Sequence, residues 1–110
     1  MKASELWALS QEFTVKERAV VLTPSLPAQL CDWNTARVAL FVCVSSSTSN
    51  NNFASTNPDI TTGQGFFLAI NGKPLELYFS QSGSLCQKAW YCTSGAPGDV
   101  LTVLEVLFQN

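Results

Sequence analysis

The chain has 110 residues, which suits one domain that buries about 65% of its unfolded surface. Only 13% of the residues are charged, about half the usual ~25%, and the net charge is −2. A chain without a basic surface cannot neutralise many phosphates, and no apolar run approaches the ~18 residues of a membrane span. We therefore expect neither nucleic acid nor a membrane as a partner.

The cysteines and the absence of histidine argue against a metal site or a cofactor. No CxxC pair occurs and the sequence contains no histidine, so a structural zinc site is not expected. The N-terminus lacks the long apolar region of a signal peptide, which predicts synthesis in a reducing cytoplasm without disulfides. The four thiols are then interpreted as small apolar residues in or near the core, at Cys31, Cys43, Cys86 and Cys92.

Residues 1–12 are predicted to form a short N-terminal arm, followed by a single β-sandwich domain over residues 13–110. Ser4 could cap one helical turn of the arm, or the arm could be extended. Trp7 is its largest apolar residue. It either packs on its own domain or anchors the arm to a neighbouring subunit, because tryptophan is favoured at interface centres.

The first two long apolar segments read as strands. Residues 13–23 alternate, with Phe13, Val15, Ala19 and Val21 on one side, which predicts a half-exposed strand with a solvated Lys-Glu-Arg run. Gln29–Trp33 leads into Arg37–Val44, which is apolar on both faces. We expect a central strand there, covered on both sides or covered on one side by a partner, with Leu40 in the core.

The Ser- and Asn-rich segment 45–58 is predicted to be a long loop between strands. Phe53 is its only large apolar residue. One interpretation is that this loop orders against a neighbouring molecule with Phe53 as the contact. The other is a mobile surface loop.

Residues 65–79 are predicted to form a β-hairpin, because Asn71-Gly72 stands between two alternating apolar runs. A two-residue turn pairs Leu68 with Leu75 and Phe66 with Leu77. The same register places one apolar set on the core face, namely Phe66, Leu68, Ile70, Leu75, Leu77 and Phe79.

Two further strands complete the prediction. Leu85–Thr93 alternates, with Trp90 as the expected centre of the core, and residues 94–99 form a turn. The last strand, Val100–Phe108, is apolar on both faces apart from Thr102 and Glu105. Residues 104–109 also match the recognition sequence of a picornaviral 3C protease, although the strand pattern accounts for them without it.

Catalytic chemistry is not expected. Without histidine there is no Ser-His-Asp or Cys-His arrangement, and the carboxylates are scattered without a close pair. The Gly63-Gln64-Gly65 segment is not a phosphate loop, because no Lys-Ser/Thr follows it. We therefore predict a protein that is not an enzyme.

Four short motifs follow one another over about residues 34–106. They are Asn34-x-x-Arg37 before an apolar strand, Gly63-Gln64-Gly65, Gln87-Lys88-Ala89-Trp90-Tyr91 and Leu101-Thr102-Val103-Leu104-Glu105-Val106. In this order and spacing they resemble a class of small tailed-bacteriophage virion proteins. The class implies a structural role on the particle, as capsid decoration, cement, or a head or tail fibre component.

The sequence therefore predicts an all-β antiparallel sandwich, with the jelly roll as one form of it. The predicted function is that of a cement protein, a homotrimer on the virion surface that bridges neighbouring major capsid protein subunits. Trp7, Trp33 and Phe53 are the candidate contacts.

Two alternatives stay open. One is a receptor- or glycan-binding tail or fibre module, for which Asp32-Trp33-Asn34 is the only local cluster of an exposed aromatic with polar neighbours. The other is a secreted domain stapled by disulfides.

Overall fold

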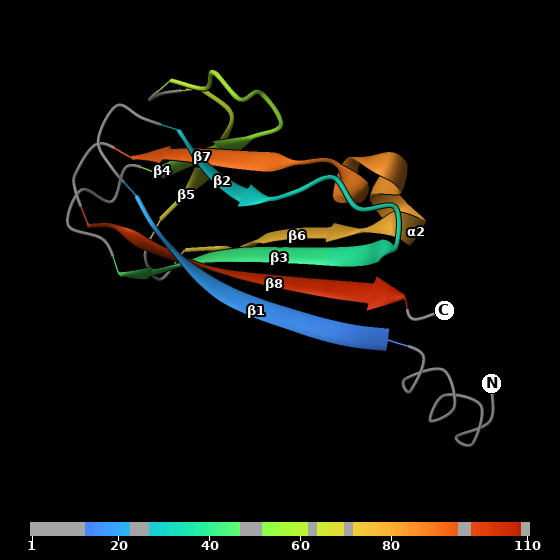
Figure 1. Cartoon of the computed structure of the whole chain (residues 1–110). Coiled ribbons are helices and arrows are strands. Elements are labelled where there is room, and N and C mark those ends of the chain that lie inside the picture. The colour runs from blue at the N-terminus through green and yellow to red at the C-terminus, as the bar shows by residue number, and fades with distance from the viewer. Residues whose placement is uncertain are drawn as a thin grey trace.

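The computed structural model describes residues 13–22, 27–46, 52–61, 64–69, 72–94 and 98–108. Within these ranges the chain forms two four-stranded antiparallel sheets, stacked as two layers (Figure 1). The elements in chain order are β1 (Phe13–Val21), β2 (Ala28–Cys31), β3 (Arg37–Ser46), β4 (Asn52–Ser55), β5 (Phe66–Leu68), β6 (Leu75–Tyr78), α2 (Phe79–Ser82), η1 (Gly83–Gln87), β7 (Trp90–Ser94) and β8 (Val100–Phe108).

The first sheet has the strand order β1-β8-β3-β6 and the second the order β2-β7-β4-β5. Strand β1 pairs with β8, β2 with β7, β3 with β6, and β4 with β5. This is the pairing that results when one long antiparallel hairpin is rolled up. The predicted all-β sandwich is confirmed, whereas the predicted arm, residues 1–12, lies outside the described residues.

The core lies between the two sheets and is built from the alternate side chains that each strand turns inward. Of the five residues predicted for it, four are buried, namely Leu40, Leu68, Leu77 and Trp90. The prediction for Phe66 was wrong, because its side chain is 42% exposed. Phe66 lies on β5, the edge strand of the second sheet, and none of the described strands lies beyond it.

The predicted hairpin was also wrong. A turn does form, since the Gly72 N–H donates to the Ala69 carbonyl at 3.0 Å. However, Leu68 pairs with Asn52 in the second sheet, while Leu75 pairs with Val42 in the first. The turn therefore carries the chain from one sheet to the other, and the predicted face breaks up with it: Phe79 begins α2 and is 49% exposed.

Two other segments differ from the prediction. The segment 45–58 contains strand β4, held between β7 and β5, so Phe53 lies in a strand and not in a loop. The predicted strand over Leu85–Thr93 begins only at Trp90, because Gly83–Gln87 forms a 3-10 turn. In both places strand formation depends on whether a neighbouring strand is available for backbone hydrogen bonds, and local composition does not show this.

Strand β1 is an edge strand whose charged side faces inward. Its register places Lys16 opposite Glu105 and Arg18 opposite Val103, and Val103 is fully buried. Lys16 and Arg18 stay exposed at this open edge. Inward-pointing charges on an edge strand discourage pairing with another chain's edge. The other side of β1, which is apolar apart from Glu17, therefore faces outward.

Candidate functional site

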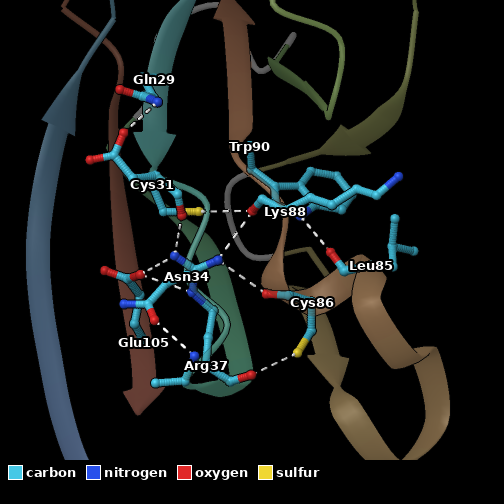
Figure 2. A network of polar contacts seen from close by, with 11 residues as sticks. Gln29, Cys31, Asn34, Arg37, Leu85, Cys86, Lys88, Trp90 and Glu105 are labelled. Atoms are coloured by element: carbon cyan, nitrogen blue, oxygen red, sulfur yellow. Dashed lines mark hydrogen bonds and ion pairs between the residues drawn. The ribbon is translucent and has the colours of Figure 1, made fainter.

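A buried arginine closes one end of the sandwich (Figure 2). Arg37, at the start of β3, is 0% exposed. Its Nε donates to Glu105 Oε1 at 2.8 Å, and its Nη2 forms an ion pair with the same oxygen. Nη1 donates to the carbonyls of Cys86 and Lys88 at 3.1 Å each, and Nη2 donates to the Asp32 carbonyl at 2.6 Å. One guanidinium thus joins β3, β8, η1 and the β2–β3 connection.

The turn that precedes Arg37 has its own hydrogen bonds. The Asn34 side-chain oxygen accepts from the Ala36 N–H at 2.9 Å, and the Asn34 carbonyl accepts from the Arg37 N–H at 3.2 Å. An asparagine that bonds to the backbone two residues on is a recurrent turn former. In the Asn34-x-x-Arg37 motif, Asn34 therefore forms a turn, and Arg37 holds the surrounding segments together, an arrangement that we name the Arg37 clamp.

The other motif pieces reach the same place. The Gln87 side chain donates to the Thr35 carbonyl at 2.7 Å, and the Gln87 carbonyl accepts from the Asn34 N–H at 2.9 Å. Trp90 Nε1 donates to the Leu85 carbonyl at 3.1 Å. Since Glu105 binds Arg37, three of the four pieces that carry the resemblance meet around one guanidinium (Figure 2).

Because all its donor nitrogens are engaged, Arg37 serves the fold and is not offered to a ligand. Beside it lies an open cleft of about 440 Å³, lined by Lys16, Glu17, Arg18, Asp32, Asn34, Arg37 and Glu105. This lining mixes cations with carboxylates. Within the described ranges no group of three or more His, Cys, Asp or Glu side chains could hold a metal ion.

Three of the thiols are buried and one is exposed. Burial raises the pKa values of Cys31 and Cys86, against the opposing effect of the Arg37 charge, and raises the pKa of Cys92 to about 12. These thiols are protonated at neutral pH and act as the small apolar residues that the sequence predicts, without disulfides. Cys43 differs, since it is exposed on β3.

The outer side of the first sheet is unusually apolar for an exposed surface. Val15 is 58% exposed, Val21 64% and Phe108 42%, so the part of the chain that the structure describes leaves this side open. The residues on this side are mostly apolar, and we name the apolar set the outer apolar face: Phe13, Val15, Ala19, Val21, Phe41, Cys43, Tyr78, Leu104, Val106 and Phe108. Glu17, Glu76 and Thr102 are polar residues on the same side.

The side chains of the outer apolar face pack on each other across the strands. Phe13 and Phe108 meet edge to face with ring centroids 5.7 Å apart, and Phe41 and Tyr78 do so at 5.5 Å. In an antiparallel sheet with one face in water, the side chains on that face are normally polar. An apolar patch of this kind marks an interaction surface.

The structure scatters the three predicted contact residues. Trp7 lies outside the described residues. Trp33 follows β2 and is 60% exposed. Phe53 is half-buried on the outer side of the second sheet, where its ring centroid lies 5.3 Å from that of Phe67. Neither belongs to the outer apolar face, and their role as contacts stays a prediction. The Asp32-Trp33-Asn34 cluster divides, because Asp32 and Asn34 line the cleft beside Arg37 while Trp33 lines a separate groove.

No protein-family model, curated protein or solved structure matches this chain. None of the helices in the described ranges is long and apolar enough to cross a membrane.

Proposed function

We propose that the chain is a non-enzymatic structural protein of a tailed-phage virion, a capsid decoration protein that oligomerises as a trimer and bridges neighbouring major capsid protein subunits. One observation carries the proposal: the outer apolar face, a set of exposed or half-buried apolar residues that spans the strands of the first sheet and is interrupted by Glu17, Glu76 and Thr102. Such a face is stable in water only at a cost, so its natural place is against another protein surface.

The size of the outer apolar face fits a protein interface. Four strands at their usual spacing and length cover on the order of 600 Å². A specific interface of standard size buries about 800 Å² per partner, which this face and its rim can reach.

The same area explains why several copies would act together. Burying ~600 Å² of mostly apolar surface contributes about 15 kcal/mol before the loss of freedom on association, which costs about 4–15 kcal/mol. For a single contact, the gain from burial therefore barely exceeds the cost of association. Copies joined in an oligomer bind their shell subunits with a higher effective concentration, and whatever they bind they stabilise by linkage.

Two further observations support the proposal. The strand pairing, β1 with β8 through β4 with β5, is the order of a jelly roll, which we take this sandwich to be; viral capsid and lectin domains use that fold. Since folds host unrelated functions, the order supports the class without choosing a role. The motif resemblance to small virion proteins points in the same direction.

The proposal is tested on the outer apolar face itself. Val15→Lys combined with Val21→Lys adds two charges at side chains that are already more than half exposed, so the fold should persist. We expect the wild-type chain to sediment as an oligomer and to copurify with heads, and the double variant to sediment as a monomer that does not. Phe67→Lys, at a 50% exposed aromatic on the second sheet, is the matched control and should behave as wild type.

Copy number separates this proposal from a receptor- or glycan-binding tail module. In virions whose genome encodes the chain, a quantitative gel should find hundreds of copies if it decorates the shell and a handful if it belongs to a tail or fibre. A wild-type chain that stays monomeric and never copurifies with capsids would overturn the proposal.

A further inference from the structure

A second concave surface lies on the other sheet. An open groove of about 270 Å³ is lined by Trp33, Thr56, Pro58, Lys88, Ala89 and Tyr91. Tyr91 belongs to β7, whose register places its side chain on the outer side, because its neighbours Trp90 and Cys92 are buried. The groove therefore opens on the outer side of the second sheet, on the far side of the sandwich from the outer apolar face.

The chemistry of this groove combines flat apolar surfaces with hydrogen-bonding groups. Trp33 is 60% exposed, and among the described residues its indole N–H has no hydrogen bond. The core tryptophan Trp90 differs, since its N–H is bonded to Leu85. Thr56 and Tyr91 add hydroxyl groups and Lys88 adds the only charge, so the described lining contains no carboxylate.

The frame around the groove is held by the buried arginine. Arg37 donates to the carbonyls of Asp32, immediately before Trp33, and of Lys88, immediately before Ala89. Cys31 also donates its thiol to the Lys88 carbonyl at 3.8 Å. Both walls are thus tied to one guanidinium, as a preformed binding site requires.

From this arrangement we propose that the Trp33–Tyr91 groove binds a carbohydrate, with one or two pyranose rings that are neutral or anionic. A pyranose presents one face of C–H groups, which packs on an aromatic ring, and a rim of hydroxyls, which needs mixed donors and acceptors. The exposed Trp33 and the half-buried Tyr91, beside threonine and lysine, supply both. The volume lies below the ~300 Å³ at which clefts for drug-sized ligands begin, which suits a small sugar.

A protein partner fits the groove less well. Specific protein interfaces bury about 800 Å² on each side, far more than this shallow depression offers by itself. The proposal goes beyond the decoration function and does not depend on it. If the outer apolar face is covered by the particle, the groove faces away from it, where glycans of a cell surface could be reached.

The test uses the full chain and follows the three indole N–H signals by NMR. The probes are cellobiose, maltose, lactose, chitobiose, mannobiose and sialyllactose, each at about 20 mM, above a dissociation constant on the order of 1 mM. We expect at least one probe to shift the Trp33 indole signal, assigned by its loss in Trp33→Phe, and to leave that of Trp90 unchanged.

Variants then locate the binding. Trp33→Ala should weaken the affinity for the active probe at least tenfold, measured by calorimetry, and Tyr91→Ala several-fold, while Phe67→Ala, an exposed aromatic outside the groove, should leave it unchanged. No shift with any probe, or equal affinity in Trp33→Ala, would overturn the proposal. A Trp33 signal that moves only on self-association or on capsid binding would also overturn it and would make the groove a protein contact. Neither result depends on the Val15 and Val21 test.

Discussion

At the scale of single residues, Arg37 shows how one buried charge is tolerated. A guanidinium carries five N–H donors in a rigid fork, and here they meet a carboxylate and three carbonyls from segments up to 68 residues away. Breaking a buried pair costs more than the pair contributes, because the remaining partner is left uncompensated.

Arg37→Ala should therefore lower the free energy of unfolding by about 3–5 kcal/mol in a urea titration. If that variant does not fold, Glu105→Gln, which keeps an oxygen acceptor for Arg37, should still show a smaller loss. The control is Arg18→Ala at an exposed arginine on β1, which should stay within about 0.5 kcal/mol of wild type. A loss for Arg37→Ala no larger than that of the control would contradict the clamp.

The buried thiols make stability fall at alkaline pH. Their pKa values are raised in the folded state, so stability is complete below the unfolded value of about 8.5 and declines as the pH rises above it, because only the unfolded chain releases these protons. For Cys92, whose pKa is raised to about 12, the decline is up to ~1.4 kcal/mol per pH unit.

Urea midpoints measured between about pH 7 and pH 10 should therefore fall with pH, as the unfolded thiols ionise. Cys92→Ala should be less stable at neutral pH, because it leaves a small cavity, but should show a shallower pH slope. All other titratable groups are the same in the two proteins, so their effects cancel in the comparison. Identical slopes would show that Cys92 is not protected from ionisation.

At the scale of elements, one glycine decides how the chain enters β5. Gly65 has φ +87°, and a Cβ there would lie 2.5 Å from the Ala54 carbonyl oxygen. The Gly63-Gln64-Gly65 segment thus needs its last glycine for a backbone conformation and for close approach to β4.

Gly65→Ala should cost at least about 2 kcal/mol of stability, since it combines a strained φ with a backbone clash. Gly98→Ala is the matched control, because Gly98 also has a positive φ, +80°, but open space around it. It should cost about 1 kcal/mol, the backbone strain alone. Thermal melts of the two variants that coincide would contradict the role of the Ala54 contact.

Long apolar segments were predictable as strands, and changes of sheet were not. Strands β1, β3 and β8 each have nine or ten residues, with β1 alternating and β3 and β8 apolar on both faces, so their existence and the central position of β3 followed from the sequence. The turn at Gly72 was also visible, but Leu68 and Leu75 alternate identically whether they pair with each other or enter different sheets. Local periodicity carries no information about that choice.

The candidate sites were only partly visible for a related reason. Arg37 and Glu105 are each the only charged residue of an apolar strand, a signal that each needs a partner, yet no local pattern joins residues 68 positions apart. The outer apolar face was indicated in the sequence by the segments of β3 and β8, which are apolar on both of their faces. Trp33 and Tyr91 came together only through the fold.

At the scale of the whole molecule, the sandwich has two unlike exteriors. The first sheet turns an apolar face outward, while the second carries a groove of aromatic and polar residues. Low charge overall is consistent with a protein whose surface is partly covered in its working state.

The reactivity of the Cys43 thiol should show whether the outer apolar face is covered in the assembled protein. Cys43 is the one exposed thiol among four and lies within the outer apolar face. In the monomeric Val15 and Val21 double variant, a thiol reagent should modify Cys43 within minutes and the three buried thiols only after unfolding. In the assembled wild-type chain, modification of Cys43 should slow at least tenfold, as followed by mass spectrometry. Equal rates in both would place the contact elsewhere.

Strand order also governs how the molecule can come into being. Strand β8 lies between β1 and β3, yet it is synthesised after the other seven strands. Until the ribosome releases it, β1 has no neighbour in its sheet and Arg37 has no counter-ion. The apolar strands made earlier therefore stay partly unpaired until β8 emerges, and we expect the nascent chain to need protection from aggregation during translation.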